Sequence, residues 1–234
     1  MTTKNHVLED LVLANRILFS EGVVDAFGHI SVRNPGNPEH FFLARNMAPN
    51  TVTSEDILEH DIDGNVIGDH RKPYLERFIH SEIYRSRPDV SAVVHSHSPS
   101  VIPFSVVETV PLRPICHMSG FIHDQVPIFE ISDFSEEATD LLITNSWLGH
   151  SVAQTLGQKN AVLMRGHGST VVADSIMRVV YRAVYLEVNA KLQLQAMNLG
   201  PIRFLSKEEA TKATKNIEGQ MIRAWNHWKS IIEI

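Results

Sequence analysis

Two histidines separated by one residue, His95 and His97, have a type and spacing suited to metal binding. They end the β-branched run VSAVVHSHSPS, which is typical of a short buried strand. Side chains two residues apart on a strand point to the same face, so both imidazoles can bind one ion. The spacing alone leaves ordinary packing as an equal alternative.

A third histidine stands in Gly166-His167-Gly168, directly after a predicted strand at residues 161–164. Flanking glycines allow another backbone to approach closely and leave the ring at an exposed edge. Three histidines at strand ends predict a divalent-metal site that keeps a position open for water or substrate, as catalytic sites do. The alternative, three unrelated histidines, requires three coincidences of placement.

Glu76 is the predicted acid/base residue. Metal-assisted lyase chemistry needs a group that moves protons while the metal stabilises a developing oxyanion. Glu76 falls in the first turn of a predicted helix at residues 74–85. The helix dipole alone would also favour an acidic residue there, and without further information that structural interpretation is preferred.

Short strands between amphipathic helices must position these residues. Alternation in HISVR predicts a strand at residues 29–33, and the turn-rich NPGNPEH joins it to an apolar run at residues 41–44. Apolar residues recur at helical spacing in three further segments, which predict helices at residues 4–21, 176–198 and 207–231.

The composition excludes several classes of partner. The 234 residues are 43% hydrophobic and 21% charged, and no repeat or linker divides them, so we expect one domain spanning residues 1–234. A net charge of −6 without a long Lys/Arg run argues against nucleic acid as a binding partner.

No apolar stretch is long enough to span a membrane and no signal-peptide pattern is present, so a cytoplasmic location is expected. The single cysteine, Cys116, is interpreted as a small buried residue.

Three motifs, followed by a long helix, together resemble the class II aldolase/adducin family: GHISVR, PYLERFIHSEIYRSRPDVSAVVHSHSP and VLMRGHGSTVV. The resemblance implies an α/β fold with a central, mainly antiparallel sheet flanked by helices on both faces. It also implies a homotetramer with active sites between subunits. By the same resemblance, His95, His97 and His167 bind the metal, and Glu76 is a metal ligand, the acid/base residue, or both.

The chain departs from the family where sugar-phosphate members bind phosphate. Those members carry a small hydroxyl or asparagine residue, a Thr-Gly pair and a Ser-Ser pair. At the matching positions this chain has Ala26 and His29, Arg45-Asn46, and Tyr74-Leu75. We therefore expect it to ignore phosphorylated sugars. The adducin branch loses the metal histidines, which this chain keeps, so a purely structural interaction module is disfavoured.

Within the family, the sequence is similar to the branch that decarboxylates aromatic acids with a hydroxyl beside the carboxylate. The resemblance implies one divalent ion, with Mn²⁺ favoured and Zn²⁺ as the alternative. We expect the substrate 3-hydroxy-2-methylpyridine-4,5-dicarboxylate, from vitamin B6 degradation, with a dihydroxyphthalate as the close competitor. An aldolase or epimerase acting on an unphosphorylated carbonyl substrate is the other enzymatic alternative.

Four further residues are candidates at this site. His117 lies where aldolases of this family place a tyrosine that donates a proton across the subunit interface, and simple packing at an interface is an equal alternative. A dicarboxylate needs a second anchor, and the planar fork of arginine matches carboxylate geometry. Arg45, Arg165 and His29 are the candidates for that anchor, with a structural role as the alternative for the arginines.

Overall fold

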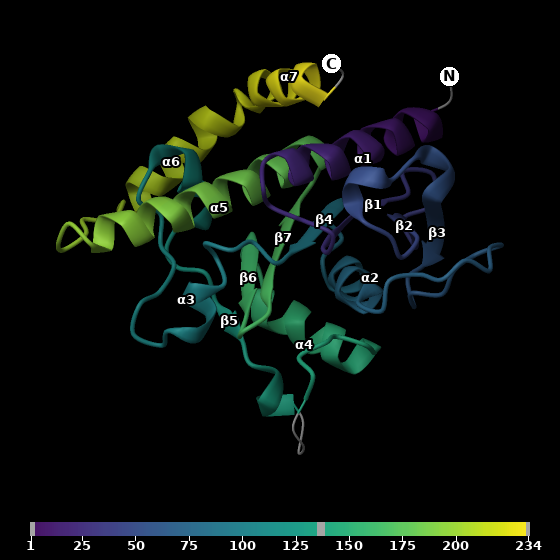
Figure 1. Cartoon of the computed structure of the whole chain (residues 1–234), viewed down its shortest axis with the longest axis horizontal. Helices are drawn as coiled ribbons and strands as arrows, with labels where there is room; N and C mark the ends of the chain where they lie inside the picture. Colours follow the sequence, from purple (N-terminus) through teal and green to yellow (C-terminus); the bar gives the residue numbers. More distant parts are fainter. Residues whose placement is uncertain (1–2, 135–138, 233–234) are drawn as a thin grey trace.

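Seven strands form one sheet in the order β3-β2-β1-β4-β7-β6-β5 in a computed structural model that describes residues 3–134 and 139–232 (Figure 1). Neighbouring strands are antiparallel except β5 and β6, which are parallel. The predicted fold class, a mainly antiparallel α/β fold, is confirmed. The strands are β1 His29–Arg33, β2 His40–Ala44, β3 Ile57–Asp61, β4 Ala92–Ser96, β5 Ile128–Phe129, β6 Ala161–Met164 and β7 Gly168–Ala173.

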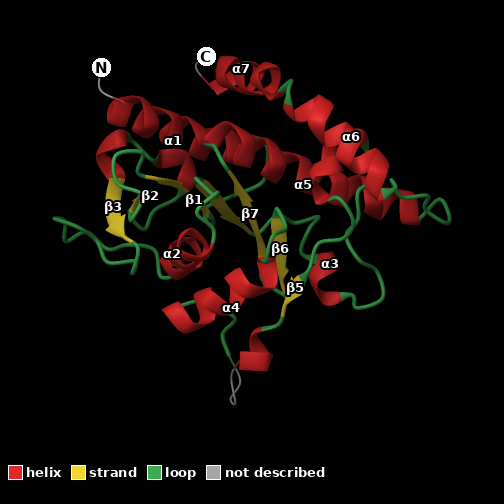
Figure 2. Ribbon diagram, turned by 180° about the vertical axis from the view of Figure 1, so that it is seen from behind, coloured by secondary structure: helices red, strands yellow, loops and turns green. Residues whose placement is uncertain are grey.

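Helices cover both faces of the sheet, as Figure 1 and the opposite view in Figure 2 show. One layer contains α1, α5 and α7, and the other contains α2 and α4. No helix of the described residues is long and apolar enough to cross a membrane. The helices are α1 Thr3–Ser20, α2 Arg77–Ser86, α3 Pro103–Val106, α4 Ser146–Leu156, α5 Ile176–Met197, α6 Lys207–Glu218 and α7 Met221–Ile232, and the 3₁₀ turns are η1 Pro49–Thr51, η2 Ser54–Asp56, η3 His117–Ile122 and η4 Ile131–Phe134.

The two-residue period of the strands decides which side chains face which helix layer. In β4, Ala92 and Val94 pack in the core beneath α1 and α5, whereas Val93 packs in the core beneath α2 and α4. His95 follows Val93 by two residues, so it lies on the face covered by α2. The same period puts His29 and Ser31 of β1 on that face, since Ile30 belongs to the opposite core.

Two predicted helices differ from the structure, one at its start and the other in its middle. The helix predicted at residues 74–85 begins only at Arg77, because Glu76 has φ −88° and ψ 19° and is its N-cap. The helix predicted at residues 207–231 is broken into α6 and α7, and α6 ends at a C-cap glycine, Gly219. Glycine weakens a helix interior by entropy, which explains the break. The sequence patterns did not predict β3, β5, β7, α3 or α4.

Candidate metal centre

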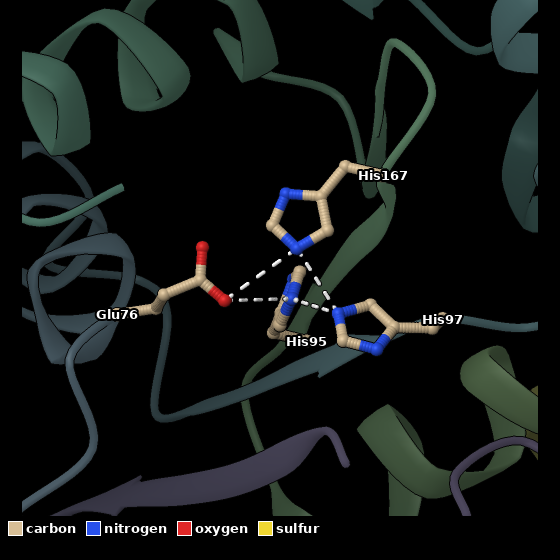
Figure 3. A group of neighbouring side chains, drawn as sticks. All are labelled: Glu76, His95, His97 and His167. Carbon is tan, nitrogen blue, oxygen red and sulfur yellow. Dashed lines mark hydrogen bonds and ion pairs between the residues drawn. The ribbon is translucent and has the colours of Figure 1, made fainter. Parts of the chain in front are cut away.

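Four side chains from three separate segments point at one another (Figure 3). His95 Nε2 lies 3.2 Å from His97 Nε2, which lies 3.0 Å from His167 Nε2. Glu76 Oε2 lies 3.4 Å from His95 Nε2 and 3.5 Å from His167 Nε2. All four ligand atoms lie within 4.8 Å of one another. The structure thus brings together the three predicted ligands and the predicted acid/base residue.

These distances fit the coordination shell of a single ion. Ligand bonds of about 2.0–2.1 Å in a tetrahedral site put neighbouring ligand atoms about 3.4 Å apart. Neutral imidazoles facing one another through Nε2 cannot all form hydrogen bonds, because each needs a donor opposite an acceptor. Three nitrogens and a carboxylate oxygen are a donor set for a divalent ion such as Zn²⁺ or Mn²⁺. The residues present therefore fit the predicted metal.

The segment Gly166-His167-Gly168 turns tightly enough to bring His167 to the other ligands. Gly166 has φ +64°, a conformation that glycine adopts without steric cost. A Cβ on Gly168 would lie 2.1 Å from the backbone oxygen of Ser96, so only glycine allows β7 to approach β4 this closely. His167 therefore lies in the turn between β6 and β7, beside the end of β4.

Glu76 is held at the cluster by its position and by one backbone hydrogen bond. It is the N-cap residue of α2 and lies 7% exposed. Its Oε1 accepts a hydrogen bond of 3.0 Å from the backbone N–H of Ile143, which leaves Oε2 facing the histidines. Ile143 was not predicted, because nothing local in the sequence relates a backbone amide to a glutamate 67 residues away.

The electrostatics of the cluster suit a cation. Burial by itself would raise the pKa of Glu76, but the facing imidazoles of His95 and His167 hold that pKa well below its usual value. Burial, followed by the nearness of His95 and His167, lowers the pKa of His97 to about 4. An ionised carboxylate and a neutral imidazole are the protonation states in which these groups bind metal.

His29 lies beside the cluster, and it belongs to a buried polar group that the sequence analysis missed. His29 pairs with His95 across β1 and β4, and the two ring centroids are 5.1 Å apart. Its Nδ1 lies 2.7 Å from Nε2 of His80, whose Nδ1 lies 2.6 Å from the hydroxyl of Ser31. The Ser31 hydroxyl in turn lies 2.7 Å from the Tyr84 hydroxyl. The signal for His80 was its position four residues after Glu76, which puts both near one side of α2.

The two predicted arginines are already engaged by carboxylates of this chain. Arg45, at the end of β2, donates a hydrogen bond of 2.8 Å from Nε to Asp56 Oδ1. Arg165 forms an ion pair with Glu130 and lines a small pocket with His167. His117 is exposed at the start of η3 and is not among the four clustered side chains. In one chain, the structure therefore brings His29 to the cluster but not His117.

The model of the family described as Class II Aldolase and Adducin N-terminal domain matches residues 9–194. The chain belongs to this family. A decarboxylase of Talaromyces stipitatus, tropJ, is 39% identical over 93% of this chain and 90% of its own length. The 3,4-dihydroxyphthalate decarboxylase of Arthrobacter keyseri is 30% identical over 82% of this chain and 79% of its own length. These relatives place the chain in the decarboxylase branch and support a lyase activity.

Solved structures agree with this assignment. The L-fuculose 1-phosphate aldolase of Glaciozyma antarctica PI12 superposes with a TM-score of 0.79 and 28% identity, over 97% of this chain and 88% of that one. An aldolase II superfamily protein of Pseudomonas syringae superposes with a TM-score of 0.80 over 100% of this chain and 94% of that one, at 24% identity. The fold inferred from the resemblance is therefore the fold of solved class II aldolases.

Proposed function

We propose that this chain is a divalent-metal-dependent, non-oxidative decarboxylase of an aromatic ring that carries a hydroxyl beside a carboxylate. Its candidate substrates are 3-hydroxy-2-methylpyridine-4,5-dicarboxylate, of vitamin B6 degradation, and 3,4-dihydroxyphthalate. The observation that carries the proposal is the convergence of Glu76 with three histidine Nε2 atoms. The decarboxylases among the relatives support the reaction type.

In this proposal His95, His97 and His167 hold the ion with Glu76 beside them. When bound, the ion supplies Lewis acidity that stabilises the oxyanion of the substrate hydroxyl. Ionised Glu76 accepts the hydroxyl proton as the substrate binds. The bond between ring and carboxylate then breaks, carbon dioxide leaves, and the ring carbon keeps the electron pair. Glu76 returns the proton to that carbon, and solvent reprotonates the oxygen on release.

The surroundings of the cluster suit an aromatic ring. Phe27 is 66% exposed, and its ring centroid lies 6.4 Å from that of His97. Leu75, the neighbour of Glu76, is also exposed. An aromatic substrate can pack its ring against such side chains while its oxygens face the polar groups. His29 is the favoured contact for a substrate oxygen, and Arg45 or Arg165 would first have to exchange its present carboxylate partner.

We further propose one Mn²⁺ per subunit, with Zn²⁺ as the alternative, bound in a cytoplasmic homotetramer built of single domains spanning residues 1–234. Added substrate oxygens would raise the coordination number, which suits manganese. Active sites between subunits would explain the exposure of Phe27 and Leu75 at the cluster in a single chain. His117 of a neighbouring subunit is then the second proposed proton donor.

The test is a carbon dioxide release assay across hydroxylated benzene and pyridine dicarboxylates, with metal content measured on the same sample. We expect metal-dependent release from a substrate with adjacent hydroxyl and carboxylate groups. Ketose and aldose phosphates are the matched controls, and they should not react because a phosphate carries nearly two charges and needs several donors. Cleavage of a sugar phosphate, or of a carbonyl substrate without carbon dioxide release, would contradict the proposal and favour an aldolase.

A further inference from the structure

A chain of hydrogen bonds runs through the core from Tyr84 to His29, whose ring lies beside that of His95. The contacts are 2.7 Å between the Tyr84 and Ser31 hydroxyls, 2.6 Å from Ser31 Oγ to His80 Nδ1, and 2.7 Å from His80 Nε2 to His29 Nδ1. Tyr84, Ser31 and His80 are at most 1% exposed, and His29 is 4% exposed. Water therefore has little access to these contacts, and each group must find its partner within the chain.

The direction of these hydrogen bonds follows from counting donors. Ser31 is the single hydrogen-bond partner of the Tyr84 hydroxyl among the residues that the structure describes. If Tyr84 accepted from Ser31, its own hydrogen would be buried without an acceptor, which costs about 1–3 kcal/mol. Tyr84 therefore donates to Ser31, and the Ser31 hydroxyl, with one hydrogen, donates to Nδ1 of His80.

The same count continues through the two histidines. Because His80 Nδ1 accepts, a neutral His80 carries its proton on Nε2 and donates it to Nδ1 of His29. A neutral His29 must then carry its own proton on Nε2. Burial disfavours the charged form of both rings. His29 Nε2 has no hydrogen-bond partner within residues 3–134 and 139–232, and its ring lies beside His95.

We propose that Tyr84, Ser31 and His80 are positioning residues that hold His29 in its Nε2–H tautomer, so that His29 donates a hydrogen bond to an anionic oxygen of the substrate. This inference rests on the proposed function for the identity of that oxygen, a carboxylate or phenolate. The opposite tautomer would present a nitrogen lone pair to the same oxygen and repel it. The Nδ1 bond of His29 thus decides whether its other nitrogen attracts or rejects the substrate.

A matched pair of variants at His80 separates the hydrogen bond from packing. In His80→Gln the side-chain amide can still donate to His29 Nδ1, whereas His80→Met fills a similar space without a donor. The tautomer of His29 is read by ¹⁵N NMR of histidine-labelled, zinc-loaded protein, with the His29 signal assigned by its absence in His29→Gln. Ser31→Ala, with the hydroxyl-keeping Ser31→Thr as control, provides the same comparison if His80→Met does not fold.

We expect Nε2–H on His29 in the wild type and in His80→Gln, and a mixture of tautomers in His80→Met. KM for the dicarboxylate should rise about tenfold more in His80→Met than in His80→Gln, with a smaller change in kcat. A wild-type His29 protonated on Nδ1, or equal KM values in the two variants, would overturn the inference.

The NMR measurement needs no substrate, so it decides the tautomer even if no dicarboxylate releases carbon dioxide and the proposed function fails. In that case, binding of salicylate, which has adjacent hydroxyl and carboxylate groups, replaces KM.

Discussion

At the residue scale, the proposed centre depends on four side chains with different backbone environments. His95 is the penultimate residue of the buried strand β4 and is fully buried, whereas His167 lies in the turn between Gly166 and Gly168. Glu76 caps a helix, and one of its oxygens is occupied by a backbone N–H. Glu76 and His167 are thus held by segments other than the one that carries His95 and His97, so removing His95 should leave Glu76 and His167 in place.

Replacing His95 with alanine should remove bound metal and activity while the chain stays folded. The physical reason is that the remaining groups lose a ligand at the centre of the site, 3.2 Å from His97 Nε2. Mass spectrometry measures the metal content of the variant, and circular dichroism shows whether it is folded. His227→Ala, outside the cluster, is the control, and full metal occupancy in His95→Ala would refute the assignment.

Glu76→Gln keeps the shape of the side chain but cannot exchange a proton. If Glu76 is the acid/base residue, kcat should fall about 100-fold or more while metal occupancy changes little. If Glu76 mainly holds the metal, occupancy should fall together with kcat. Near-normal turnover in metal-loaded Glu76→Gln would remove Glu76 from the mechanism and leave His117 as the proposed proton donor.

His60 should make the fold sensitive to acid. Burial, followed by the nearby positive charge of Arg77, lowers the pKa of His60 to about 4, against 6.5 in a model peptide. As the pH falls, the unfolded chain therefore binds this proton at a higher pH than the folded chain does. The free energy of unfolding keeps its full value above about pH 6.5 and decreases as the pH falls from there to about 4. The loss from this one group is at most about 3 kcal/mol.

The test compares wild type with His60→Leu by urea unfolding at neutral and acidic pH. The difference between their free energies of unfolding should shift in favour of the variant as the pH falls, because leucine does not titrate. Neither nitrogen of His60 is hydrogen-bonded to another side chain among the described residues, so the substitution breaks no bond between side chains. A pH-independent difference would show that His60 is not the acid-sensitive group.

At the scale of elements, the contact between α2 and α4 positions Glu76. Gly149 of α4 lies so close to α2 that a Cβ would be 2.3 Å from the backbone oxygen of Phe78. A backbone oxygen cannot rotate away as a side chain can. The two helices can therefore accept a larger residue only by moving apart, and α2 would carry its N-cap Glu76 with it.

Gly149→Ala should lower the free energy of unfolding by about 1–3 kcal/mol, as overpacking does. It should also weaken metal binding, because Glu76 would no longer meet the histidines at the same distances. Urea unfolding and metal titration measure the two effects. Gly36→Ala is the matched control, since its Cβ would come no closer than 3.4 Å to another group. Unchanged stability and metal affinity in Gly149→Ala would contradict this account of α2.

At the scale of the whole molecule, the role of His117 depends on whether the active site is formed by one subunit or shared between two. It is exposed on η3, which packs against α6 and α5, whereas the metal cluster lies on the face covered by α2. If His117 is a proton donor, we expect it to serve the cluster of a neighbouring subunit. The assembly therefore decides whether His117 has a catalytic role.

Mixed assemblies of His95→Ala and His117→Gln subunits test this arrangement. If His117 is an essential proton donor, each variant alone should be nearly inactive. If every site combines the two residues from different subunits, random mixing in equal amounts should restore about a quarter of the sites. Activity is measured after co-expression or after mixing under conditions that exchange subunits. No recovery, together with a monomeric mass by analytical ultracentrifugation, would contradict a shared site.

The sequence by itself determined the local part of this centre. A two-residue period aligns His95 with the next ligand, and two glycines predict the close turn around His167, because strand periodicity and glycine geometry depend only on neighbouring residues. The motifs also predicted the family and the sheet, which the comparisons and the structure confirmed.

The tertiary structure decided the contacts between distant residues. Glu76 meets the amide of Ile143, 67 residues away, and His29 meets His80, 51 residues away. Arg165, a candidate anchor for the second carboxylate of the substrate, forms an ion pair with Glu130, 35 residues away. Such contacts depend on the register of β1 against β4 and on the placement of α2 and α4, and packing of the whole chain sets both.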